Sequence, residues 1–396
     1  MQHHQGSSSR RNFLRGTAAA ALAAALPRGA RAADDVKVGL ILPLSGPFAS
    51  TGRQIEAAVH LYMARNGDNA GGRKVTVLVR DDTGLAPETT KRIAQELITR
   101  EGVAVIAGFG LTPLAFATAP VATEAKVPMV VMAAATSVIP QRSPFIVRSG
   151  FTVPQITAPI AQWGAKQGMK RMVSMVTDYA PGLECEKTFL KVYGDAGGTM
   201  VESLRTPLRN PDYGPFLQRV KDAKPDALFL FVPSGEGAAV MKQFADRGLK
   251  EAGIKLICTG DVLDDDLLEA IGQPALGIVS SHHYSAAHKS PENKAYVEGF
   301  MKANGGKRPN FMSVGGYDGM HVIYEALKRT KGDTNGEKLV EAMKGLEWVS
   351  PRGPMSIDPA TRDVVQNVYI RKCEKVDGKL WNVEFETIER VKNPVA

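Results

Sequence analysis

The chain has 396 residues, of which 44% are hydrophobic and 23% are charged, and it carries 49 basic residues, 41 acidic residues and three cysteines. This length is sufficient for two domains with separate cores. Five of the arginines lie in the first 32 residues, so the rest of the chain has a net charge of only about +3. Such a balance argues against a nucleic-acid-binding surface.

The first 32 residues have the three parts of an export signal. A basic segment with Arg10-Arg11 and Phe13-Leu14 precedes an apolar stretch at 17–26, and Ala30-Arg31-Ala32 follows as a cleavage signal. The stretch is well short of the roughly 20 apolar residues that a membrane-spanning helix needs. Since the arginine pair with Phe-Leu behind it resembles a twin-arginine signal, we predict export over that route to the periplasm.

Apolar strand-like segments then alternate with helical patterns. The predicted strands are 37–44, 75–80, 103–108, 128–132, 171–177, 200–204, 227–232, 255–259 and 277–281. The predicted helices between them include 54–65, 88–99, 155–166 and 237–247. Strands that are apolar on both faces and alternate with helices are typical of parallel sheets covered by helices. The sequence therefore predicts an α/β fold with doubly wound, Rossmann-like sheets.

The alternation is interrupted three times, which indicates two lobes joined by three crossover segments. The interruptions lie at 145–155, 282–290 and 350–359. We predict an N-terminal lobe of residues 33–150 plus 286–350 and a C-terminal lobe of residues 151–285 plus 351–396. The tail at 363–391 alternates apolar and polar residues around Asp377-Gly378, which predicts a hairpin at the edge of one lobe. Two such lobes would enclose a ligand between the carboxyl ends of their strands.

The usual catalytic signatures are missing from the sequence. It contains no GxSxG, GxxxxGK[ST] or HExxH motif, and no GxGxxG motif after the first strand. Gly108-Phe109-Gly110 lacks the further glycine and the lysine of a phosphate loop, and instead favours a close approach of the backbone to a small ligand. We therefore predict a binding protein with no catalytic residues, cofactor or metal.

Histidines and cysteines each allow two interpretations. His282, His283 and His288 are possible metal ligands, but neighbouring residues of a strand point to opposite faces, so we favour a solvated crossover. The three cysteines lie far apart without CxxC spacing. They predict either one disulfide with a leftover thiol or three buried free thiols.

Two groups of aspartates are given structural roles. Asp264-Asp265-Asp266 are interpreted as acids at a helix start, where they complement the helix dipole. Asp81-Asp82 follow the second predicted strand and are interpreted as turn formers. Neither group is predicted to be catalytic.

Small polar residues recur just after successive predicted strands in both halves. They are Ser45, Thr51, Thr112, Thr136, Ser137, Tyr179, Ser234 and Asp261. Hydroxyls and the N–H groups at helix starts bind a carboxylate without a full cation. Each serine or threonine alone is explained as a helix N-cap, but their recurrence favours a site for a small carboxylate.

Several motifs together resemble the type I periplasmic binding proteins of the branched-chain amino-acid (leucine/isoleucine/valine) uptake family. The motifs are LPLSGPFASTG at 42–52, IAGFGLTPLAFATAPVATEAKVPMV at 106–130, AAATS at 133–137, DYAPG at 178–182 and VGGYDGM at 314–320. The resemblance implies the substrate-binding component of an ABC transporter, a monomeric two-lobed clamp that docks to an inner-membrane permease. The alternative is a periplasmic sensor that uses the same clamp to signal to a membrane receptor.

The resemblance also implies a ligand site. Its predicted residues are Ser45, Phe48, Thr51, Phe109, Gly110, Leu111, Thr112, Ala134, Ala135, Thr136, Tyr179, Ser234 and Asp261. In the family, hydroxyl and N–H groups of the first lobe hold the α-carboxylate, here Thr112, Ala134 and Thr136. The second lobe supplies a tyrosine and an acid for the ammonium group.

The sequence departs from the family where the ammonium group should bind. Asp261 lies one residue from the expected position of the acid, and an aromatic position of the first loop is occupied by Thr51. A buried ammonium without a carboxylate partner is costly. Two ligand classes therefore stay open, branched-chain or related amino acids and amine-free aromatic acids. We favour the second, because Phe48, Phe109 and Tyr179 are suited to stacking on a ring.

Overall fold

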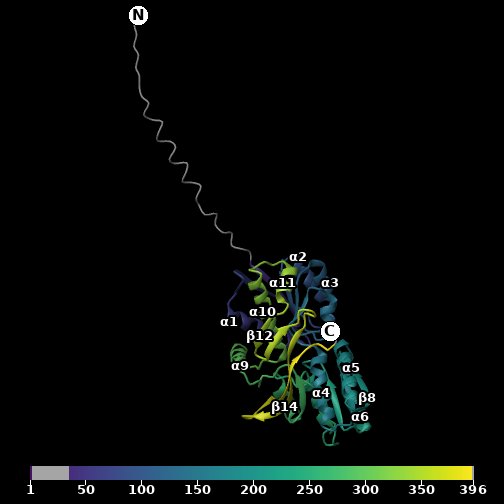
Figure 1. Ribbon diagram of the computed structural model, residues 1–396. Helices are drawn as coiled ribbons and strands as arrows, with labels where there is room; N and C mark the ends of the chain where they lie inside the picture. Colours follow the sequence, from purple (N-terminus) through teal and green to yellow (C-terminus); the bar gives the residue numbers. More distant parts are fainter. Residues whose placement is uncertain (2–34, 395–396) are drawn as a thin grey trace. The chain divides into compact units, whose positions relative to one another are not determined.

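The computed structural model describes residues 35–394 together with Met1, so nearly all of the predicted signal peptide lies outside the described residues. From residue 36 onward, strands and helices alternate in two successive rounds, and each round builds a sheet of its own (Figure 1). None of the helices formed by the described residues combines the length and the apolar character needed to span a bilayer.

The first sheet has six strands in the order β2-β3-β1-β4-β5-β6. All neighbouring strands are parallel except the short β2, which pairs antiparallel with β3. Six of the seven residues of β1 (Val36–Leu42) are buried, as expected for a strand that helices cover on both faces. The other strands are β2 (Asn69–Ala70), β3 (Arg73–Asp81), β4 (Val105–Gly108), β5 (Met129–Val131) and β6 (Ile146–Arg148).

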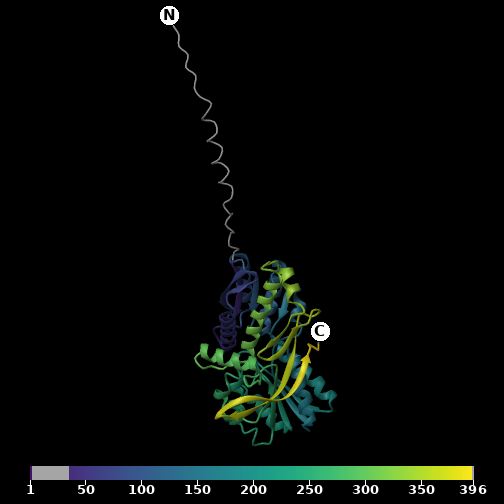
Figure 2. The ribbon, with the colours of Figure 1, turned by 60° about the vertical axis from the view of Figure 1, so that its left-hand side comes forward.

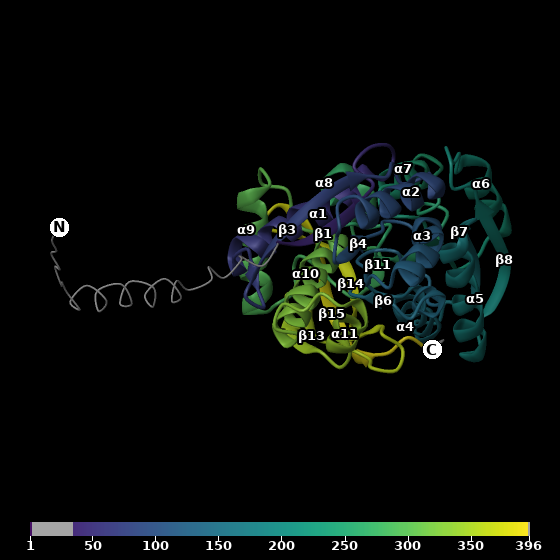
Figure 3. The same ribbon diagram turned by 90° about the horizontal axis from the view of Figure 1, so that it is seen from above.

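Helices from two distant parts of the chain cover this sheet. They are α1 (Ala49–Asn66), α2 (Pro87–Thr99), α3 (Thr112–Ala125), α9 (Pro291–Ala303), α10 (Phe311–Arg329) and α11 (Gly336–Met343), with a 3-10 turn η1 (Ile139–Arg142). Seen from above, α2 and α3 pack together on one side of β1 and β4, and α10 and α11 lie on the other side (Figure 3). Asn310 fixes the start of α10, because its side chain accepts hydrogen bonds from the N–H groups of Met312 and Ser313, both at 3.0 Å.

The second sheet has nine strands in the order β12-β13-β14-β11-β10-β9-β7-β8, with β15 paired to β14. Its strands are β7 (Arg171–Thr177), β8 (Thr199–Thr206), β9 (Ala227–Phe231), β10 (Lys255–Thr259), β11 (Val279–His282), β12 (Glu347–Ser350), β13 (Gly353–Ile357), β14 (Val364–Val376) and β15 (Lys379–Val391). Its helices are α4 (Val153–Lys166), α5 (Ala180–Asp195), α6 (Gly214–Ala223), α7 (Gly237–Asp246) and α8 (Leu268–Ile271), with a 3-10 turn η2 (Gln273–Ala275). The strands from β7 to β11 pair in parallel, whereas β12 to β15 pair antiparallel.

The predicted tail hairpin is confirmed. β14 and β15 are joined by Asp377 and Gly378, which both have left-handed backbone conformations (φ 49° and 80°). Figure 2 shows this hairpin in yellow as a long ribbon that runs diagonally across the front of the molecule. β14 pairs with β11, so the hairpin extends the second sheet.

The prediction of a two-lobed α/β fold with parallel strands is confirmed. The exact boundaries of the two lobes stay a prediction. Strand pairing places β12 and β13 in the second sheet, although β13 lies within the interruption predicted at 350–359. β6, which also lies within a predicted interruption, completes the edge of the first sheet.

Candidate functional site

A cavity with about 410 Å³ of empty space, its mouth included, lies between the two lobes. The first lobe contributes Phe48, Thr51, Gly110, Leu111, Thr112, Ala133, Ala134, Ala135 and Met312. The first crossover and the second lobe contribute Phe151, Val153, Tyr179, Pro181, Phe231, Pro233, Ser234 and Asp261.

Sheet topology explains why the cavity forms here. From β1 the chain goes first to β3 on one side and then to β4 on the other, and from β7 it goes to β8 and then to β9 in the same way. At such switch points the loops after neighbouring strands diverge and leave a crevice. The loops after β1 and β4 form one wall of the cavity, and the loops after β7 and β9 form the other.

The backbone after β4 is bent into the cavity wall. Phe109 has a left-handed conformation (φ 67°), which is uncommon for a residue other than glycine. Its N–H donates to the carbonyl of Ile41 at 3.0 Å, and its own carbonyl accepts from the N–H of Ala134 at 2.9 Å. Gly110 has no room for a side chain, because a Cβ atom there would lie 2.7 Å from Cγ of Pro43. The bend is therefore fixed before any ligand enters.

Thr112 offers neutral hydrogen-bond donors to the cavity. It is the first residue of α3, and its own N–H lies beside its hydroxyl, whereas Pro113 has no N–H and the N–H of Leu114 donates to the carbonyl of Leu111 at 3.2 Å. Its Oγ1 lies 2.9 Å from Oγ1 of Thr136, and both side chains are buried. Of the described residues that line the cavity, none is a lysine, an arginine or a histidine. A carboxylate bound at this wall is held by neutral groups.

The opposite wall combines aromatic rings with an acid. The ring of Tyr179 stacks on Phe231, with 6.3 Å between centroids and 22° between planes. Burial, reinforced by the charge of Asp261, raises the pKa of Tyr179 well above its usual value, so it stays a neutral phenol. Asp261 is 4% exposed, and no hydrogen bond to its Oδ2 atom is seen within the described part of the chain.

His282 and His283 lie directly behind Asp261, and the interpretation of these residues as a solvated crossover is wrong. Both are fully buried, and their ring centroids are 4.5 Å apart. Nε2 of His282 is 3.5 Å from Oδ2 of Asp261. Burial nevertheless lowers the pKa of His282 to about 4, so the ring is neutral near pH 7. The charge of Asp261 is not compensated by this neighbour.

Asp264, Asp265 and Asp266 do not cap a helix, so that prediction is also wrong. The helix that follows, α8, has four residues and begins only at Leu268. The carboxylates instead accept hydrogen bonds from side chains that are distant in sequence. The donors include Ser234 and Asn310 for Asp264, Asn382 for Asp265, and Ser50, Gln54 and Asn310 for Asp266. They connect the loop after β10 to both lobes.

The prediction that Asp81 and Asp82 form turns is confirmed. Oδ1 of Asp81 accepts from the N–H groups of Leu44 and Thr83 at 2.9 and 2.8 Å, and Asp82 accepts from the N–H of Gly84 at 3.0 Å. Among the cysteines, the second of the two interpretations holds: Cys185, Cys258 and Cys373 are all free and buried.

The structure brings most of the predicted site residues to the cavity. Those that line it are Phe48, Thr51, Gly110, Leu111, Thr112, Ala134, Ala135, Tyr179, Ser234 and Asp261. Three others do not line it. Ser45 is exposed and hydrogen-bonds to Asp81, Phe109 is buried in the core of the first lobe, and Thr136 lies behind Thr112.

Several lining residues were missed by the sequence analysis. They include Phe151, Val153, Pro181, Phe231 and Met312. Phe231 ends a strand and Phe151 lies in a crossover, so each has the pattern of a core residue. Their positions gave the available signal. Phe231 lies next to the end of the predicted strand 227–232, and Phe151 lies within the predicted interruption 145–155.

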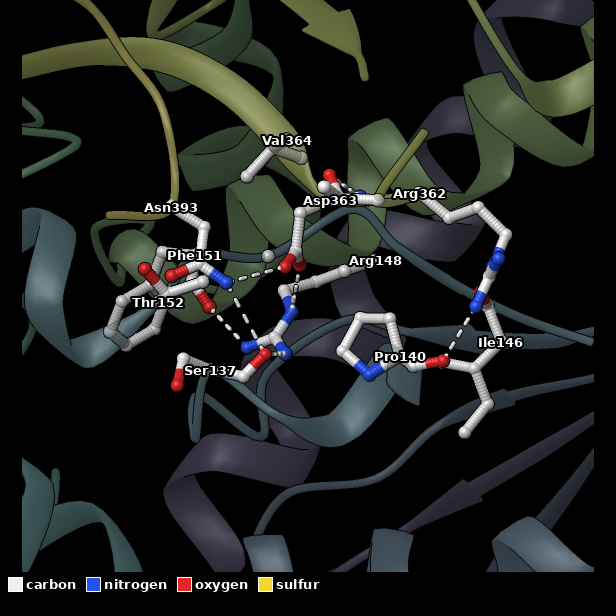
Figure 4. Close-up of polar contacts among 12 residues, drawn as sticks. Ser137, Pro140, Ile146, Arg148, Phe151, Thr152, Arg362, Asp363, Val364 and Asn393 are labelled. Carbon is white, nitrogen blue, oxygen red and sulfur yellow. Dashed lines mark hydrogen bonds and ion pairs between the residues drawn. The ribbon is translucent and has the colours of Figure 1, made fainter. Parts of the chain in front are cut away.

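A buried arginine holds one wall of the cavity in place (Figure 4). The guanidinium of Arg148 donates to the carbonyls of Ala134, Thr136 and Phe151 at 3.3, 2.7 and 2.9 Å. Its Nε atom forms a 2.7 Å ion pair with Asp363, just before β14. Arg148 thereby connects the wall after β5 to two of the segments that cross between the lobes.

Two lobes whose facing loops close around a small cavity define a solute-binding protein. A family model described as periplasmic binding protein matches residues 35–379, and a model for the twin-arginine translocation signal sequence matches residues 7–27. The chain belongs to the periplasmic binding protein family. It is the substrate-binding component of an ABC uptake transporter, and it is exported to the periplasm by the twin-arginine route.

The relatives include proteins of known structure. Leu/Ile/Val-binding protein homolog 6 of Brucella abortus (strain 2308) is 45% identical over 372 residues, which cover 93% of this chain and 95% of that protein. A solute-binding protein from Rhodopseudomonas palustris BisB5, solved with 3,4-dihydroxybenzoic acid, is 55% identical with a TM-score of 0.89, over 91% of this chain and 99% of the other. Another from R. palustris, solved with 4-hydroxybenzoate, is 43% identical with a TM-score of 0.88 over the same shares.

Proposed function

We propose that the ligand of this transport component is an aromatic carboxylate of the hydroxybenzoate class. The observation that carries the proposal is the composition of the cavity wall. Four aromatic side chains line it, Phe48, Phe151, Tyr179 and Phe231, and a ligand ring is well suited to pack among them. The two R. palustris relatives were solved with compounds of this class, which supports the same assignment here.

The two ends of such a ligand have different partners. The carboxylate binds at the first-lobe wall, to the hydroxyl and the N–H of Thr112 and to the N–H of Ala135. The ring hydroxyl donates to Asp261, whose buried Oδ2 atom accepts no hydrogen bond within the described part of the chain. Leu111 and Thr51 complete the first-lobe wall, and Ser234 stands beside Asp261 on the other.

Asp261 is also the acid that an amino-acid ligand would need for its ammonium group, so replacement of this residue distinguishes the two ligand classes. Isothermal titration of the mature chain with 4-hydroxybenzoate, 3,4-dihydroxybenzoate, benzoate and leucine is the test. We expect binding of the benzoates and none of leucine. Asp261→Asn should weaken 4-hydroxybenzoate about tenfold or more and leave benzoate nearly unchanged, because only the former donates to the carboxylate. Tight binding of leucine that Asp261→Asn abolishes would overturn the proposal.

The same proposal includes two properties of the chain itself. It binds its ligand without chemical conversion, and it works as a monomer that presents the closed complex to the permease. Recovery of the bound compound unchanged after prolonged incubation tests the first, and light scattering of the purified protein tests the second. A converted product or a stable dimer would contradict the respective statement.

A further inference from the structure

Two carboxylates of the second lobe contact the first lobe close to residues that line the cavity, without lining it themselves. Glu184 lies on α5, and Asp266 lies in the loop after β10. Neither is among the residues that line the cavity. Glu184 accepts from Ser137, which is two residues from the lining residue Ala135. Asp266 accepts from Ser50, which is next to the lining residue Thr51.

Glu184 contacts one residue of the first lobe, Ser137, which donates to it from both its N–H and its hydroxyl. The N–H of Ser137 donates to Oε2 of Glu184 at 3.0 Å and to Oε1 at 3.2 Å, and the hydroxyl of Ser137 also donates to Oε1. Glu184 is half-buried by this contact, and burial raises the pKa of its carboxyl group. A separation of the lobes at this point must break these hydrogen bonds.

Ser137 is held rigidly for this contact. Its carbonyl accepts from Nη2 of Arg148 at 3.4 Å and from Nδ2 of Asn393 at 3.3 Å. Asn393 also donates to Asp363, the ion-pair partner of Arg148, at 2.9 Å. Figure 4 shows these side chains converging on Ser137. With its carbonyl held on the inner side, Ser137 presents its N–H and hydroxyl to Glu184 at little further cost in conformational entropy.

The contact of Asp266 is built in the same way. Its Oδ2 atom accepts from the hydroxyl of Ser50 at 2.9 Å and from Nε2 of Gln54 at 3.2 Å, both on α1. Nε2 of Gln54 also donates to the carbonyl of Arg308 at 2.9 Å, which fixes its orientation. Both contacts therefore pair a carboxylate of the second lobe with neutral donors of the first lobe that are already held in place.

We propose that Glu184 and Asp266 are clasps that set the fraction of closed protein, and hence the affinity for every ligand, without contacting the ligand. The inference adds to the transport role and does not depend on which ligand binds. Because apparent affinity is proportional to the closed fraction, the loss of a clasp lowers affinity by the same factor for all ligands. Most of the change should appear in the dissociation rate.

The chain offers a matched control for Glu184. Glu186 lies two residues further along α5 and pairs with Arg205 of β8 at 2.9 Å, within the second lobe. Glu184→Ala should raise Kd about tenfold for each benzoate that binds and speed dissociation by a similar factor. Glu186→Ala should leave both unchanged. Ser137→Ala, which removes the hydroxyl and keeps the N–H, should give a smaller increase in Kd.

A measurement without ligand separates this inference from the identity of the ligand. Spin labels at Gln95→Cys on α2 and Asp222→Cys on α6, both exposed positions, report the distance between the lobes, and the native cysteines are buried. Glu184→Ala or Asp266→Ala should shift the ligand-free distance distribution toward longer distances, and Glu186→Ala should not. Identical distributions and dissociation rates for Glu184→Ala and Glu186→Ala would overturn the inference. So would a change in Kd that differs between ligands, since it would indicate contact with the ligand.

Discussion

Replacement of Thr112 by valine tests whether the first-lobe wall holds the ligand carboxylate. The side chains have nearly the same shape, so the change removes the hydroxyl and little else. Thr112 and Thr136 share one hydrogen bond between their hydroxyls, at 2.9 Å. When Thr136 donates to Thr112, the proton of Thr112 is free to donate to a carboxylate in the cavity.

The expected loss follows from the type of bond. A hydrogen bond to a charged group contributes about 1.5–3 kcal/mol, so Thr112→Val should raise Kd for 4-hydroxybenzoate by about 10- to 150-fold. The variant also leaves the buried hydroxyl of Thr136 without its partner, which should lower the free energy of unfolding by about 1–3 kcal/mol. Titration calorimetry measures the first effect, and denaturant unfolding of the ligand-free protein measures the second.

Thr112→Ser is the control, because it retains the hydroxyl and loses only a methyl group. It should bind within a few-fold of the wild type. If Thr112→Val binds 4-hydroxybenzoate as tightly as the wild type does, the carboxylate lies elsewhere in the cavity. The assignment of the two ends of the ligand to the two walls of the cavity would then have to be reversed.

Three further changes probe the wall, the buried charges and the fold. Phe231→Leu removes a ring from the stack with Tyr179 and should weaken benzoates about two- to tenfold in calorimetry. Because Phe231 is buried in the core, the same change should also lower the melting temperature of the ligand-free protein. An unchanged Kd would place the ligand ring away from this wall. His282 has a pKa of about 4 in the folded protein and about 6.5 in the unfolded chain, so acid protonates the unfolded chain first. From pH 7 to pH 5 the wild type should therefore lose about 2 kcal/mol of unfolding free energy relative to His282→Asn, as measured by urea unfolding. Parallel curves of stability against pH would show that the ring is already charged or solvated. Arg148→Met leaves the 3%-exposed carboxylate of Asp363 without its ion-pair partner and should cost about 3–5 kcal/mol of stability. Asp363→Asn should restore part of this loss in the double variant. Additive losses would mean that the two groups are not coupled.

Local patterns were sufficient to predict the sheets. A parallel strand covered on both faces is apolar throughout, and 255–259 was predicted with the bounds that β10 has in the structure. The segment 353–357 was missed because Pro354 indicates a loop, although β13 lies next to the short terminal strand β12 of the sheet, where the pairing tolerates it. Fold class thus depends on periodicity that the sequence contains, and edge strands depend on tertiary pairing.

The site was predictable in most of its polar residues and in the apolar ones that the family resemblance supplied, such as Phe48 and Leu111. Hydroxyls after strands, such as that of Thr112, have few structural uses beyond helix capping, so their recurrence was informative. Phe231 and Phe151 gave no such signal, because an aromatic residue has the same pattern in a core and in a ligand wall. The run Asp264 to Asp266 indicated a helix start, yet its partners come from α1, α10 and the terminal hairpin, which only the folded chain brings together.

The distribution of charged contacts fits a protein that must open again. Arg148 with Asp363, and Arg352 with Asp318 at 2.8 Å, are buried ion pairs whose arginines lie on crossover segments, where the two lobes keep their connection. Breaking such a pair by removal of one partner costs several kcal/mol, so these segments stay intact when the lobes separate. Across the cavity, by contrast, Glu184 and Asp266 meet neutral hydroxyl and amide donors, which water replaces at much lower cost. Strong pairs at the crossovers and weaker contacts between the facing lobes fit closure around a ligand and its release without loss of the fold.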